Sequence, residues 1–153
     1  MNLKSTLILG MLLMVSSPAR AQQPDVKEMG PLLGKTFAEL AGWVLKSAEM
    51  VPADKYTYKA TPQQRDFGQQ VLHIAQANIN NLRFLGGKAP APMLNRNATS
   101  KAEAIAAMDA SFDYGTALIN EYNDQTLMET VQTNQFLGPS SRARVIWLSL
   151  IHI

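Results

Sequence analysis

The stretch FGQQVLHIAQANINNLRFL, residues 67–85, decides the expected fold of this chain. Its apolar residues recur at spacings of three and four, the period of an α-helix, and they fall on two adjoining faces. A helix that is apolar on two faces packs against more than one neighbour, so we expect this segment at the centre of a helical bundle. The two faces consist of Phe67, Val71, Ile74, Asn78 and Leu85, and of Leu72, Ala75, Ile79 and Leu82.

Signals for the two ends of this helix stand on either side of it. Thr61 offers an N-cap, Pro62 suits the first helical position, and Gln64 completes a capping box. The pair Gly86-Gly87 provides a stop, because glycine readily adopts the left-handed conformation that ends many helices. We therefore predict a long helix that begins at Thr61 and ends at Gly86.

A first helix is predicted over residues 34–49, and a third one after residue 100. The first ends before Pro52, which disfavours helix in the residue before it. The third begins with a capping box formed by Ser100 and Glu103. The apolar faces consist of Phe37, Leu40, Val44, Leu45 and Ala48 in the first helix, and of Ile105, Met108, Phe112, Gly115, Ile119 and Tyr122 in the third.

The C-terminal part predicts a short helical turn near Leu127, a loop at residues 138–141 and a fourth helix that begins near Arg142. No segment shows the alternation typical of a strand, and no internal repeat is present. The expected fold is therefore all-α, a four-helix bundle whose last helix is incomplete. The apolar stripe left bare by an incomplete helix would favour self-association, so we expect a homodimer.

The connector between the second and third helices, residues 86–99, is rich in Gly, Pro and Asn. Extended at about 3.3 Å per residue, it reaches about 45 Å, whereas a helix of 20 residues is only about 30 Å long. Connectors between adjacent antiparallel helices usually have about two to eight residues. We therefore predict a crossover loop that runs the length of the bundle and starts the third helix parallel to the second.

Residues 1–21 have the pattern of a cleavable export signal. Lys4 precedes an apolar run over residues 7–15, and Ala19-Arg20-Ala21 forms a cleavage site of small residues. The run is too short for a bilayer, which needs about 20 apolar residues. We therefore predict a periplasmic or secreted protein that begins at Gln22 after cleavage, without a membrane anchor. Residues 22–33 are expected to form a flexible lead-in, and residues 34–153 the helical domain.

Charge and cysteine content limit the possible partners. Of the 14 Lys and Arg residues, Lys4 and Arg20 lie in the signal, so 12 basic residues balance 12 acidic ones in the mature chain. Without a basic run, the chain lacks the electrostatic footprint of a nucleic-acid-binding protein. It contains no Cys, so neither disulfides nor a lipid anchor on cysteine can form. The expected partner is a small molecule of unknown identity.

Several segments together resemble the DinB-like superfamily. They are the first predicted helix and residues 52–56, 60–62, 67–75, 111–114 and 142–147. The resemblance implies a four-helix bundle with a long connection between helices 2 and 3. In many members it also implies a divalent metal ion (Zn, Ni or Fe) that is held by one histidine on helix 2 and two on helix 4. Some members use this metal to transfer thiols.

The resemblance assigns His73 to the first ligand position, and His152 lies about where the second would fall. The chain has only these two histidines, so it departs from the three-histidine pattern. The last six residues, 148–153, read like the translation of a transposon adapter used in sequencing libraries. We therefore predict that they are not native, that the natural fourth helix is longer, and that this chain binds no metal tightly.

Other interpretations of these residues stay open. His73 lies among apolar residues and would also suit a hydrogen-bonded core histidine. Asp109 and Asp113, four residues apart on one helix, could join a site or form a solvated face, as could Glu39 and Glu49 on the first helix.

The sequence supports two functions and identifies no catalytic residue. The first is an exported, metal-dependent enzyme of the thiol transferase or hydrolase type. Three neutral imidazoles would leave an open position at the metal, where it can activate water or a thiol. The second is a metal-free periplasmic binding or stress protein that keeps the bundle without the chemistry.

Overall fold

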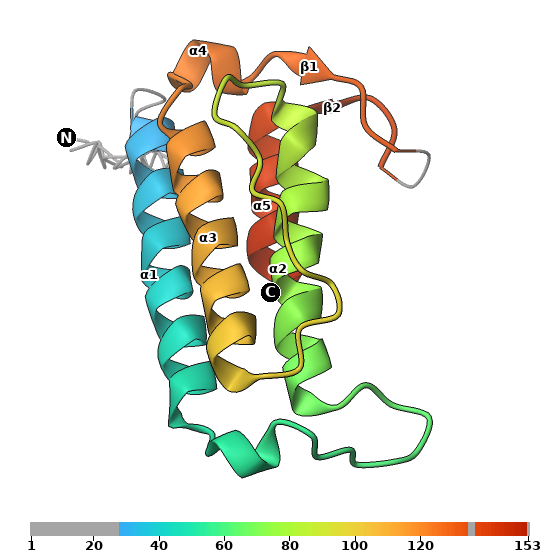
Figure 1. The fold of residues 1–153 in the computed structure, drawn as a ribbon. Helices are drawn as coiled ribbons and strands as arrows, with labels where there is room; N and C mark the ends of the chain where they lie inside the picture. The colour runs from blue at the N-terminus through green and yellow to red at the C-terminus, as the bar shows by residue number, and fades with distance from the viewer. Residues whose placement is uncertain (1–27, 135–136, 153) are drawn as a thin grey trace, which may run out of the picture.

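The computed structural model describes residues 28–134 and 137–152, which are mostly helical. Four long helices lie side by side (Figure 1): α1 (Met29–Met50), α2 (Phe67–Leu82), α3 (Lys101–Ile119) and α5 (Arg142–His152). The shorter elements are η2 (Ala53–Lys55), η3 (Arg83–Leu85), α4 (Asp124–Leu127), β1 (Thr130–Val131) and β2 (Ser140–Ser141). The all-α prediction is confirmed. The predicted export signal lies outside the described residues.

Helix α1 begins at Met29, ahead of its predicted start, so it includes the last part of the segment 22–33 that the sequence predicts as a flexible lead-in. The amide of Gly30 donates to Asp124 Oδ1 at 2.7 Å. This bond satisfies one of the amides that the first turn of a helix leaves unpaired. The two residues are 94 positions apart, so no local pattern marks this helix start. The predicted end before Pro52 is confirmed.

The predicted start of α2 at Thr61 is wrong, because the N-cap is Asp66. The Asp66 carboxylate accepts from the amide of Gln69 at 2.7 Å, and the Gln69 side chain accepts from the amide of Asp66 at 3.0 Å. The reason lies in tertiary structure. The carbonyl of the buried Tyr56 accepts from the amide of Gly68 at 2.8 Å. This contact holds the preceding segment in a non-helical path against the first turn of α2.

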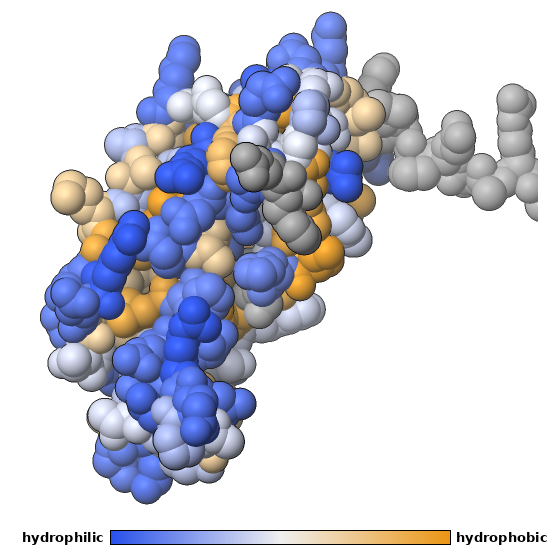
Figure 2. Space-filling view, turned by 90° about the vertical axis from the view of Figure 1, so that its right-hand side faces the viewer, coloured by the Kyte–Doolittle hydropathy of each residue, from blue (hydrophilic) through white to orange (hydrophobic). Residues whose placement is uncertain are grey.

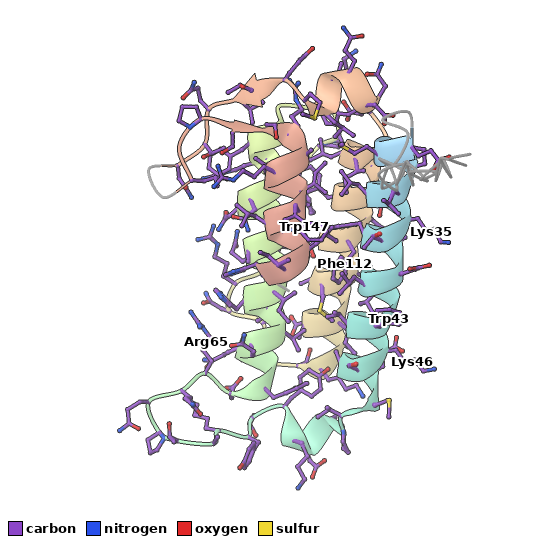
Figure 3. All side chains as sticks on the ribbon, turned by 180° about the vertical axis from the view of Figure 1, so that it is seen from behind. Lys35, Trp43, Lys46, Arg65, Phe112 and Trp147 are labelled. Carbon is purple, nitrogen blue, oxygen red and sulfur yellow. The ribbon has the colours of Figure 1, made fainter. Side chains whose placement is uncertain are left out.

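The core lies between the long helices. Helix α2 contacts α3 and α5, one neighbour for each of its two apolar faces, but α1 contacts the same two helices, so α2 is not more central than α1. Phe112 of α3 points into this core (Figure 3). Its ring meets that of Phe37 edge to face, with 5.7 Å between centroids and 68° between planes, a favoured aromatic geometry. The fully buried apolar residues include Phe37, Ala75, Leu82, Leu85, Met108, Leu127 and Ile146.

The crossover loop, residues 86–100, follows the course that its length predicts. It leaves η3 at Gly86, whose φ of 74° lies in the left-handed region that favours glycine. The loop then runs back along α2 to the start of α3, so that α2 and α3 are parallel (Figure 1). The carboxylate of Glu121 holds its beginning, accepting from the amides of Lys88 at 2.7 Å and Ala89 at 2.8 Å. The predicted Ser100–Glu103 capping box ends it.

These bonds make the anchoring of the loop pH-dependent. The amides of Lys88 and Ala89 lower the pKa of Glu121 below its ordinary value. A carboxyl with a lowered pKa stabilises the fold above its ordinary pKa of about 4.3, and this stabilisation is lost as the pH falls. We expect Glu121→Gln to lower the melting temperature at pH 7, and the gap to the unmodified protein to narrow as the pH falls below the ordinary pKa of the carboxyl.

Thermal unfolding followed by circular dichroism at several pH values measures this gap. The matched control is Glu39→Gln, which removes an exposed carboxylate from α1. The control should show a small effect, because the ion pair that Glu39 forms with Lys35 at 3.9 Å is exposed. A gap for Glu121→Gln that stays constant from pH 7 to pH 3 would contradict the role given to the carboxylate.

The segment before α5 corrects the expectation that the chain has no strand. Strands β1 and β2 pair antiparallel, with Thr130 opposite Ser141. Each strand has two residues, too few to show alternation in the sequence. Helix α5 begins at Arg142 as predicted, and Ser141 Oγ accepts from the amide of Arg144 at 3.3 Å. Within the described ranges, no helix is both long and apolar enough to cross a bilayer.

Candidate functional site

The packing of α5 on α2 brings together the two histidines of the chain. The His73 and His152 rings have their centroids 6.3 Å apart, with 65° between their planes. His73 is half-buried in the middle of α2, and His152 is exposed in the last turn of α5. The structure therefore places both predicted metal-site residues in one location.

The separation of the rings can be compared with that of two imidazoles on one metal ion. A zinc–nitrogen bond of about 2.0 Å puts each ring centre about 3.2 Å from the ion, so at the tetrahedral angle two such rings lie about 5.2 Å apart. The observed 6.3 Å is longer than this separation by about 1 Å. Because His152 is exposed, a small rotation of its side chain can shorten the distance. After a shift of about 1 Å, the pair would have the separation of two ligands on one zinc ion.

The surroundings of His73 favour its neutral form. Burial lowers its pKa first of all, and the positive charges of Arg65 and His152 lower it further. Neutral imidazole is the form that binds metal ions, and it can also both donate and accept a hydrogen bond. The neutral imidazole of His73 can therefore either bind a metal ion or form hydrogen bonds with a ligand.

Both histidines line a cavity of about 330 Å³ between α2, α5 and the segment that joins β1 to β2. We call it the α2–α5 cavity. Its polar groups include the amides of Asn80, Asn81 and Asn134, and Phe84 contributes an apolar wall. The volume is at the lower end of the range for small-molecule sites, about 300 to 1,000 Å³.

His73 also lines a second cavity, of about 320 Å³, between α2 and the crossover loop. We call it the α2–loop cavity. Its other lining residues are Arg65, Gln69, Leu72, Gln76, Leu94, Asn95 and Arg96. Figure 2 shows the side of the molecule that carries α2, where hydrophilic residues predominate and hydrophobic ones appear between them.

The carboxylates considered as further ligands lie elsewhere. Asp109 and Asp113 are exposed on α3, and Glu39 and Glu49 are exposed on α1, as expected for solvated helix faces. Among the described residues, no group of three or more His, Cys, Asp or Glu side chains could hold a metal ion. At this place the described residues offer two candidate ligands, the imidazoles of His73 and His152.

Sequence reasoning missed most of the residues around His73. One signal in the sequence indicated these residues, a polar stripe beside the apolar faces of α2. It consists of Gln69, His73, Gln76 and Asn80, which recur at the spacing of a single helix face. A polar stripe on a central helix indicates a cavity or a wet interface. Arg96 had no such signal, since it reaches α2 only through the path of the crossover loop.

Comparisons of this chain with protein-family models, with curated proteins and with solved structures give no match. The function is therefore inferred from the geometry of the two cavities and from the residues that line them.

Proposed function

We propose that this protein is an exported helical bundle of DinB-like type that binds a divalent metal ion between His73 and His152. One observation carries the proposal. The only two histidines of the chain lie on different helices, line the same cavity and have their ring centroids 6.3 Å apart. The parallel course of α2 and α3, joined by a long loop, also supports a bundle of this type.

The two imidazoles would fill two positions of an ion such as zinc, which commonly takes four ligands in proteins. The other positions would be open to water or to a small molecule in the α2–α5 cavity. A metal with open positions acts as a Lewis acid and activates bound water. His73 would hold the ion from the rigid middle of α2, while Asn80 and Asn81 would orient the small molecule by hydrogen bonds.

We expect metal binding to be weak, because two protein ligands hold zinc less tightly than three or four. The test is a zinc titration of protein purified without a histidine tag and treated with EDTA. Imidazole proton signals in NMR report binding directly, since only two histidines contribute to them. Both signals should shift together and saturate, and His73→Ala and His152→Ala should each abolish saturation.

The matched control for this titration is Asp109→Asn, which removes an exposed carboxylate on α3 and should change nothing. Zinc binding that survives either histidine variant would contradict the proposed site. Tight one-to-one binding that needs both histidines would confirm the site and contradict the expected weakness.

A second candidate function is that of a metal-free binding or stress protein. The observation in its favour is that His73 lies between two cavities and borders both. In this role its neutral imidazole would hydrogen-bond to a ligand directly. Ligand binding that persists in EDTA would favour this candidate over the metal-dependent one.

A further inference from the structure

Two arginines from different parts of the chain line the α2–loop cavity. Arg65 belongs to the segment before α2 and lies beside the first turn of that helix (Figure 3). Arg96 belongs to the crossover loop, which returns past the same part of α2. The remaining polar lining groups are His73 and the amides of Gln69, Gln76 and Asn95.

Of the residues that the structure describes, no acidic one lines this cavity. Within the same part of the chain, neither Arg65 nor Arg96 forms an ion pair, in contrast to Arg142, which pairs with Glu129. The acidic residue nearest in sequence, Asp66, uses its carboxylate to cap α2. It lines two neighbouring cavities, one with Arg65 and one with Arg96, but not the α2–loop cavity. Two positive charges therefore line one small space without a counter-charge from the described residues, which favours an anion there.

Leu72 and Leu94 add apolar surface to the lining. The cavity thus combines guanidinium groups, amide groups and an apolar patch within about 320 Å³.

We propose that the α2–loop cavity binds a small organic oxyanion, a carboxylate or phosphate monoester, through Arg65 and Arg96. The planar guanidinium group presents paired N–H donors that match two oxygens of such an anion. The apolar part of the ligand would lie against Leu72 and Leu94. The site is separate from the proposed metal site, with which it shares only His73, so it does not require a metal ion.

The test uses protein that has been stripped of metal with EDTA and then dialysed free of EDTA, because EDTA is itself a polycarboxylate and would compete for the site. This protein is titrated with phenyl phosphate and, separately, with inorganic phosphate. Amide signals of Gln69 and Arg96 and the ring signals of His73 are followed by NMR. We expect saturable shifts that localise to this cavity, and tighter binding of phenyl phosphate than of inorganic phosphate. Equal affinity for the two probes would contradict the proposed contact between the apolar part of the ligand and Leu72 and Leu94.

Two variants and one control decide the role of the arginines. Arg65→Gln and Arg96→Gln should each weaken phenyl phosphate binding about tenfold or more, as expected for the loss of a charged hydrogen-bonding partner. Arg144→Gln removes an exposed charge from α5 and should leave the affinity unchanged. Equal affinities in Arg65→Gln, Arg96→Gln and the unmodified protein would overturn the proposal, as would the same loss in Arg144→Gln.

Circular dichroism confirms that the variants fold. Failure of zinc binding with intact phosphate binding would reject the metal site alone, and the reverse result would reject the anion site alone.

Discussion

Gly115→Ala is expected to destabilise the protein by about 3 kcal/mol, the upper part of the usual range for an overpacked core. A Cβ atom at this position of α3 would lie 2.4 Å from Phe37 Cζ and 2.8 Å from Leu82 Cδ1. Phe37 cannot move away easily, because its ring is fully buried and packs edge to face on Phe112. Chemical denaturation followed by circular dichroism measures the change in the free energy of unfolding.

A matched glycine and a second substitution test this explanation. Gly42 lies inside α1, where a Cβ atom would have no atom of the described residues within 4 Å, so Gly42→Ala should stabilise the protein by about 0.5–1 kcal/mol. Phe37→Leu removes the ring edge that meets position 115, so Gly115→Ala should cost about 1 kcal/mol less in that background. Additive costs for the two core substitutions would contradict the steric cause.

Arg142→Met is expected to lower the free energy of unfolding by about 2–3 kcal/mol. The Arg142 side chain is only 17% exposed and joins three regions of the chain. Its Nε donates to the carbonyl of Leu85 at 2.9 Å, and its Nη1 donates to the carbonyl of Thr126 at 2.9 Å and to Glu129. Its guanidinium carbon lies 4.8 Å from the centre of the Tyr122 ring.

The loss should come mainly from the charged hydrogen bonds of the guanidinium group and from the ring contact. Both carbonyls keep a partner, since the Tyr122 hydroxyl also donates to Leu85 at 2.8 Å and the amide of Glu129 also donates to Thr126 at 3.2 Å. The Glu129 side chain is 56% exposed, so Glu129→Gln should cost little. Arg144→Met, at an exposed position two residues further on, is the matched control and should have almost no effect. Equal unfolding free energies for the Arg142 and Arg144 variants would contradict the bridging role.

Three signals that act within one helical turn are confirmed by the structure. Pro52 ends α1, Gly86 takes the left-handed conformation after η3, and Ser100 with Glu103 caps α3. In each case the residue type restricts its own backbone or bonds an amide three positions away. The apolar faces of α2 were also predictable, because helix period alone determines which side chains share a face.

Where two local signals compete, or where residues far apart in the sequence meet, only the tertiary structure determines which arrangement forms. Both Thr61 and Asp66 are good N-caps, and the bond from the amide of Gly68 to the carbonyl of Tyr56 favours Asp66. The approach of His152 to His73 depends on how α5 packs against α2, and that of Arg96 on the path of the crossover loop. Such distances follow from side-chain volumes and packing across the whole core, which no local sequence window contains.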